Sequence, residues 1–72
     1  MNVLNFLKDQ NRRTFTIDDV DDRDTDVFYT QVVVKLRELR DSGVIEELAE
    51  LRDRRNTVVR VDIIGGINLD RL

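Results

Sequence analysis

The sequence predicts a small α+β domain in which three helices precede a C-terminal β-hairpin. Three features predict it: an apolar stripe at helical spacing in residues 26–42, the Ser42-Gly43 pair directly after it, and alternating apolar and polar side chains in residues 57–63. The 72 residues suffice for one hydrophobic core. We therefore expect the order α-β-α-α-β-β in one domain of residues 1–64, followed by a tail or linker of residues 65–72.

The composition argues against several kinds of chemistry. The chain has no cysteine and no histidine, so it lacks disulfides and the commonest soft or imidazole metal ligands. The usual catalytic bases and nucleophiles are also missing, and the only serine, Ser42, lies where a helix should end. We therefore expect a protein that is not an enzyme, with no catalytic residues, metal, cofactor or small-molecule substrate.

The distribution of apolar residues bears on where the protein works. The N-terminal residues carry no basic lead and too short an apolar run for a signal peptide, and nowhere do 18 apolar residues follow one another. These features predict a soluble cytoplasmic protein without a membrane partner.

Two short helices and a strand are expected before residue 24. Asn2 can cap a first helix that runs to about Gln10. Residues 14–16 are β-prone and predict a short strand. Thr16 and Asp19 have the spacing of a capping box, which predicts a second short helix with Ile17 on its buried side.

Residues 18–26 are the most acidic part of the chain, with six aspartates and one arginine. Carboxylates at alternate positions suit calcium, but this segment has no central glycine and no acid at the twelfth position of such a loop. We therefore interpret residues 21–26 as a capped, solvated turn. The basic charge lies elsewhere, with four arginines and one aspartate in residues 51–60.

The third helix is expected over residues 26–42. Its buried stripe would be Phe28, Val32, Leu36 and Leu39. Residues 27–34 are rich in β-branched and aromatic side chains and would also suit a strand. Helix is favoured because the stripe continues into the strongly helical residues 35–40.

Two interpretations compete for residues 44–51. Val44, Ile45, Leu48 and Leu51 have helical spacing, yet the alternation in residues 57–63 indicates a strand that needs a partner. We predict a hairpin across residues 52–56, with Asn56 at positive φ. Gly65-Gly66 should end the second strand, and the tail after it could be a linker, a final strand or a self-association segment.

The pattern of elements resembles the winged helix-turn-helix DNA-binding domains. Residues 32–45 resemble the third helix and first wing strand of that family, residues 15–20 resemble its strand and second helix, and residues 3–7 resemble its first helix. Residues 35–45 are also similar to winged modules attached to some restriction endonucleases.

The resemblance implies sequence-specific binding of double-stranded DNA, as in transcription regulation, by a homodimer. It places the third helix in the major groove, the arginine-tipped wing on phosphates and two further arginines as flanking phosphate contacts. Carried over by position, the groove residues are Tyr29, Thr30, Val33, Val34 and Arg37, the wing residues are Arg52, Arg54 and Arg55, and the flanking residues are Arg12 and Arg13.

Other interpretations of these residues stay open. Arg37 could pair with Asp41 at the i,i+4 spacing, and arginines of a hairpin turn can be merely solvated. Val33 and Val34 depart from the family, which places polar or basic side chains on that face. They fit an alternative function, a winged-helix protein-protein interaction or dimerisation module, and the net charge of −3 also argues against nucleic acid.

Overall fold

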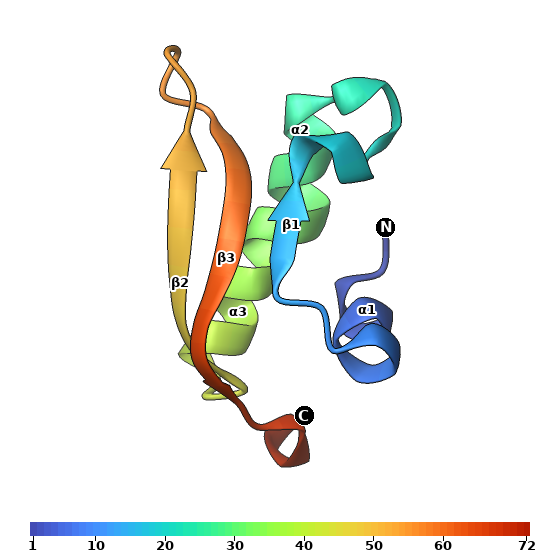
Figure 1. Ribbon diagram of the computed structural model, residues 1–72, viewed down its shortest axis with the longest axis vertical. Coiled ribbons are helices and arrows are strands. Elements are labelled where there is room, and N and C mark those ends of the chain that lie inside the picture. Colours follow the sequence, from blue (N-terminus) through green and yellow to red (C-terminus); the bar gives the residue numbers. More distant parts are fainter.

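A three-stranded antiparallel sheet forms one layer of the structure, and a long helix covers one of its faces (Figure 1). The computed structural model describes all residues, 1–72. The strand order is β1-β3-β2. The elements are α1 (Val3–Gln10), β1 (Thr14–Thr16), α2 (Thr25–Phe28), α3 (Val34–Asp41), β2 (Ile45–Arg52) and β3 (Val58–Ile67).

The first helix is as predicted. Its N-cap Asn2 accepts a hydrogen bond from the backbone N–H of Asn5 at 3.3 Å. Val3 and Leu7 are buried, and the helix ends at Asn11, whose φ of 49° is left-handed.

The predicted second helix is wrong. Residues 17–23 form two single 3₁₀ turns, Ile17–Asp19 and Asp21–Arg23. The capping box is present, with the Thr16 N–H donating to Asp19 at 2.8 Å, but the chain turns extended at Val20 (φ −108°, ψ 150°) and enters the left-handed region at Asp22, whose φ is 58°. Aspartate side chains bond readily to nearby backbone and so favour turns over helix interiors.

The fold class must be corrected accordingly. The structure is α+β with two helices and a three-stranded antiparallel sheet. The predicted winged helix-turn-helix arrangement of three helices and a small hairpin wing is wrong. A helix-turn-helix needs a second helix directly before the long helix, and residues 17–23 do not form one.

The long helix itself was predicted correctly. It consists of α2, a π-helical turn (Tyr29–Val33) and α3, and spans 17 residues. Asp24 caps its start by accepting hydrogen bonds from the N–H groups of Asp26 and Val27. At its end, Gly43 has φ 84° and the Val44 N–H donates to the Leu39 carbonyl at 2.9 Å, a pattern that satisfies the last carbonyls.

The π-helical turn decides which valines are buried. The Val34 N–H donates to the Tyr29 carbonyl, five residues back, so this turn holds more residues than an α-helical turn. The predicted stripe of Phe28, Val32, Leu36 and Leu39 stays buried, and at this turn the buried face widens so that Val33 is fully buried as well. The outward direction predicted for Val33 is wrong.

The hairpin reading of residues 44–63 is confirmed. β2 pairs antiparallel with β3, and Asn56 in the connecting turn has φ 64°. The break predicted at Gly65-Gly66 is wrong, because β3 continues to Ile67. Gly65 has φ 78°, and the pairing shifts between Ile45 and Glu47, so the glycines form an irregularity within the strand.

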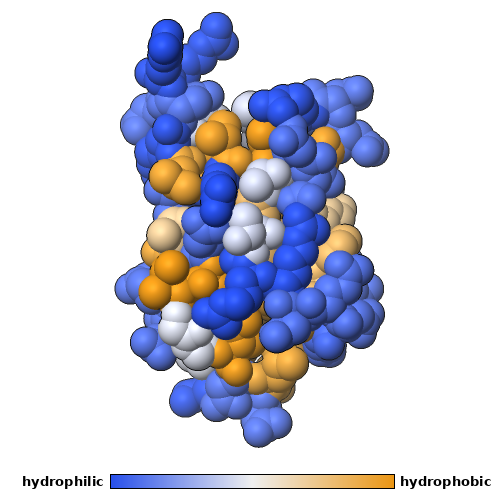
Figure 2. All heavy atoms as spheres, in the orientation of Figure 1, coloured by the Kyte–Doolittle hydropathy of each residue, from blue (hydrophilic) through white to orange (hydrophobic).

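β1 lies on the other side of β3 and completes the sheet. Phe15 pairs with Val61, and both side chains are fully buried on the face of the sheet that packs against the long helix. All 15 buried residues are hydrophobic. The opposite sheet face is covered by no other element and mixes apolar and polar side chains (Figure 2), with Leu51 and Ile64 about half exposed.

Candidate nucleic-acid interface

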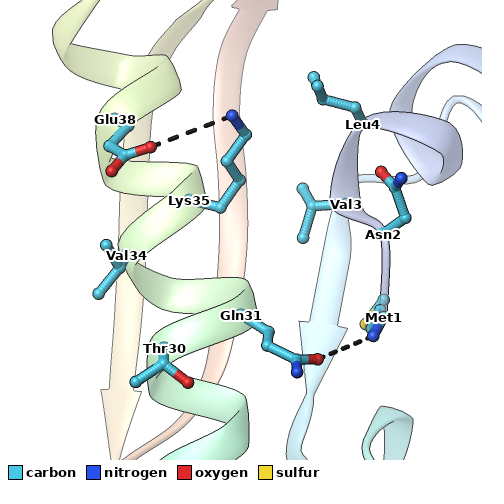
Figure 3. A pocket seen from close by; sticks show the side chains of 9 residues that line it. All are labelled: Met1, Asn2, Val3, Leu4, Thr30, Gln31, Val34, Lys35 and Glu38. Atoms are coloured by element: carbon cyan, nitrogen blue, oxygen red, sulfur yellow. Dashed lines mark hydrogen bonds and ion pairs between the residues drawn. The ribbon is translucent and has the colours of Figure 1, made fainter.

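The structure separates the residues that were predicted to form a groove-binding helix face. Tyr29 and Thr30 are exposed, but Val33 is in the core. Val34 is partly buried and lines a groove of about 260 Å³ between the long helix and the start of the chain (Figure 3). Gln31 reaches across this groove and accepts a hydrogen bond from the amino group of Met1 at 2.8 Å.

Arg37 is held within the protein. Its Nε and Nη2 atoms donate to the two carboxylate oxygens of Glu50 on β2, both at 2.7 Å. Its Nη1 donates to the Tyr29 hydroxyl at 2.9 Å, and the guanidinium lies 5.3 Å from the Tyr29 ring centre. The alternative partner, Asp41, is not used by Arg37. Because Glu50 occupies two parallel N–H donors of the guanidinium, Arg37 cannot offer that pair of donors to a DNA base.

Arg52 shares the same carboxylate. Its Nη2 lies 3.6 Å from Glu50, and its Nη1 donates to the Asn56 carbonyl at 2.9 Å. Two guanidinium groups therefore approach one carboxylate, which leaves positive charge in excess at the base of the turn. The contacts from Tyr29 through Arg37 and Glu50 to Arg52 join the long helix to the hairpin.

The turn beyond Arg52 holds its arginines away from the protein. Asp53 accepts hydrogen bonds from the N–H groups of Arg55 and Thr57 at 2.9 and 3.0 Å, which shapes the turn. Arg54 and Arg55 are exposed, and neither side chain has an ion-pair partner. We call Arg52, Arg54 and Arg55 the arginine tip.

The two predicted flanking arginines have structural partners. Arg12 forms an ion pair with Asp19, and its guanidinium lies 5.1 Å from the Phe6 ring centre and 4.9 Å from that of Phe15. Arg13 donates to the carbonyls of Ile63 and Gly65 on β3. Both arginines thus tie the α1–β1 connection to neighbouring elements.

Glu50 is the residue that the sequence analysis missed. It lies on β2 opposite Val61, whose side chain is buried, so it occupies the face of the sheet that meets the long helix. An acid in phase with Leu48 on a half-buried strand is a signal that a basic partner is near. That this basic partner is Arg37 depends on how the long helix packs on the sheet, and the spacing of residues in the sequence does not give that packing.

Ion pairing lowers the pKa of two carboxylates. The hydrogen bond from Arg37 lowers the pKa of Glu50 despite its partial burial. Burial tends to raise the pKa of Asp19, but the hydrogen bonds from Arg12 and the Thr16 N–H outweigh it, so that pKa is lowered as well.

The Glu50 pKa predicts a stability that depends on pH. Because the pKa is lower in the folded state, the ionised pair stabilises the fold above the unfolded-state pKa of about 4.3 and loses this effect as pH falls through the folded value. We expect Glu50→Gln to lower the free energy of unfolding at pH 7 and to differ less from the parent near pH 3. Urea unfolding followed by circular dichroism measures both. A difference that does not shrink on acidification would contradict the pairing.

Neither helix has the length and apolar composition needed to cross a lipid bilayer. Comparison of the chain with protein-family models, curated proteins and solved structures found no match in any of the three.

Proposed function

We propose that this chain binds double-stranded DNA through the arginine tip, in the role of a regulatory module. The observation that carries the proposal is the state of the arginines: Arg54 and Arg55 project from the end of the hairpin without an intramolecular partner, and Arg52 beside them shares its carboxylate with Arg37. Phosphate contacts of this type supply most of the sequence-independent affinity for DNA.

The shape of the hairpin supports the same function. The turn stands at one end of a molecule whose longest extent is 35 Å, clear of the helices (Figure 1). A two-stranded ribbon is narrow enough to enter the major groove, and arginine forks fit phosphate geometry. Within the chain the positive charge is concentrated in the hairpin turn itself, where three arginines accompany one aspartate in residues 52–56.

In this proposal fewer residues of the long helix contact DNA bases than the resemblance to winged helix-turn-helix domains implies. Val33 is buried, Val34 is partly buried and Arg37 is bound to Glu50, so Tyr29 and Thr30 are the exposed members of the predicted groove face. Tyr29 contacts Arg37 and so adjoins the network that ends at Arg52. In this proposal the tip positions the duplex and Tyr29 and Thr30 meet base edges or the sugar-phosphate backbone.

A charge-reversal experiment tests this proposal. The Arg54→Glu/Arg55→Glu variant should bind a fluorescent random duplex at least about tenfold more weakly than the parent, and its salt slope should fall by about two, because two phosphate contacts are lost. Fluorescence anisotropy at low and moderate salt measures both quantities.

The matched control reverses two cations elsewhere. Lys8 lies on α1 and forms no ion pair, and Arg23 forms an exposed pair with Asp18. Lys8→Glu/Arg23→Glu changes the net charge by the same amount and should bind nearly as the parent does. Equal binding by the tip variant and the parent would refute the assignment of the tip.

A protein-protein interaction module is the second candidate function. The uncovered sheet face supports it, since Leu51 and Ile64 there are 50% and 49% exposed. Absence of salt-dependent duplex binding by the parent protein would favour this candidate over DNA binding.

A further inference from the structure

We infer that the arginine tip of a second copy of this chain docks into an acid-rimmed pocket, which would make the protein a two-fold dimer. The acidic pocket has a volume of about 520 Å³. It is lined by Met1, Phe6, Val20, Val27 and Gln31, and by aspartates at positions 19, 21, 22 and 24, which we call its rim.

Two of these rim carboxylates are unoccupied by any cation of the same chain. Asp19 is paired with Arg12, and Asp24 accepts the hydrogen bonds that cap the long helix. Asp21 and Asp22 are exposed and form neither an ion pair nor a side-chain hydrogen bond. The nearest other arginine in sequence, Arg23, is paired with Asp18.

Arginine fits a pocket of this composition. A guanidinium can donate two parallel hydrogen bonds to a carboxylate, and its aliphatic stem can lie on apolar side chains such as Phe6 and Val27. Arg54 and Arg55 are the exposed arginines of the hairpin turn without a partner in their own chain. Arg54 and Arg55 thus have no carboxylate partner within one chain, and Asp21 and Asp22 have no cationic partner.

A two-fold dimer of this kind requires the tip and the rim of the pocket to lie at the same end of the molecule. The hairpin turn and the aspartate-rich turns are two separate projections at the same end of the molecule (Figure 1). Both are strongly hydrophilic, with apolar side chains between them (Figure 2). Two copies related by a two-fold axis near this end could each insert a tip into the partner's pocket, as an isologous interface requires.

This dimer is independent of the proposed DNA binding but would compete with it. Arg54 and Arg55 cannot contact a phosphate and a partner's carboxylate at the same time. Adding duplex DNA should therefore shift the dimer toward monomer if both proposals hold, since a ligand of one state draws the equilibrium toward that state.

Two complementary variants test the dimer in the absence of DNA. One is Arg54→Glu/Arg55→Glu. The other is Asp21→Arg/Asp22→Asn, in which asparagine suits the left-handed backbone at position 22, where φ is 58°. Each variant alone places like charges at both contacts, so its self-association should be at least about tenfold weaker than that of the parent. An equimolar mixture of the two places opposite charges at both contacts and should associate again.

Sedimentation velocity at low ionic strength, over a range of protein concentrations, measures the self-association of the parent, the two variants, their mixture and the control variant. The Lys8→Glu/Arg23→Glu variant keeps the tip and makes the acidic rim more negative, so it should dimerise at least as well as the parent, and circular dichroism confirms that each variant is folded. A parent that stays monomeric, a tip variant that dimerises as well as the parent, or folded variants that fail to associate when mixed would each overturn the inference. These outcomes leave the anisotropy result untouched, so the two proposals fail separately.

Discussion

Replacing Val33 with aspartate should unfold most of the protein at neutral pH. The Val33 side chain is completely buried in a core whose buried residues are all hydrophobic, so a carboxylate placed there would lose its water without a buried polar partner. Burying an unpaired charge costs several kcal/mol, whereas a chain of this length is expected to be stable by about 4 to 10 kcal/mol. Urea unfolding of the variant, followed by circular dichroism at 222 nm, a helix-sensitive wavelength, measures the loss.

The neighbouring position supplies the control. Val34→Asp changes the same residue type in the same helix, but Val34 is only partly buried and lines the open groove beside α1. Its free energy of unfolding should fall by about 1 kcal/mol. Similar losses at the two positions would show that Val33 and Val34 do not differ in burial as described above.

Phe15→Ala should cost about 3 to 5 kcal/mol of the free energy of unfolding. The Phe15 ring is fully buried, lies opposite Val61 of the central strand β3 and contacts the guanidinium of Arg12. Removing the ring leaves a cavity beneath the long helix and also loosens the Arg12–Asp19 pair. Thermal and urea unfolding both report the change.

Phe6→Ala separates the contribution of ring burial from that of the contact with the Arg12 guanidinium. Phe6 also lies against the Arg12 guanidinium, at 5.1 Å, but its ring is exposed to solvent in part. We expect a loss smaller than that of Phe15→Ala by at least about 2 kcal/mol, since less apolar area leaves water there. If Phe6→Ala were the more destabilising change, the contact with Arg12 rather than burial would dominate at Phe15.

Local signals in the sequence predicted most of the regular elements. The Asn2 cap, the apolar stripe ending at Ser42-Gly43 and the alternation in residues 57–63 each involve residues close in sequence, and each element forms where expected. The failures arose where local preferences compete. The capping box at Thr16 formed but started only a 3₁₀ turn, because the following aspartates favour turns, and Gly65-Gly66 was absorbed into a strand that β2 holds in register.

The candidate site was predictable only in part, for a related reason. The exposure of Arg54 and Arg55 follows from their place in a turn. The partners of the other arginines lie on different elements: Arg37 meets Glu50 on β2, and Arg13 meets carbonyls of β3. Such pairs depend on tertiary packing, and a single sequence gives no spacing rule for them.

The position of Glu50 also determines how the hairpin behaves mechanically. Arg37 fixes β2 to the long helix at Glu50, and Val58 on the paired strand is buried in the core, whereas beyond these residues only the Arg52 contacts and the hydrogen bonds of the turn hold the ribbon. The hairpin is therefore fixed to the core along its inner part, and its turn is free of contacts with other elements. Its arginines can shift to match differently spaced anions while the inner part, and the hydrophobic core behind it, keep their geometry.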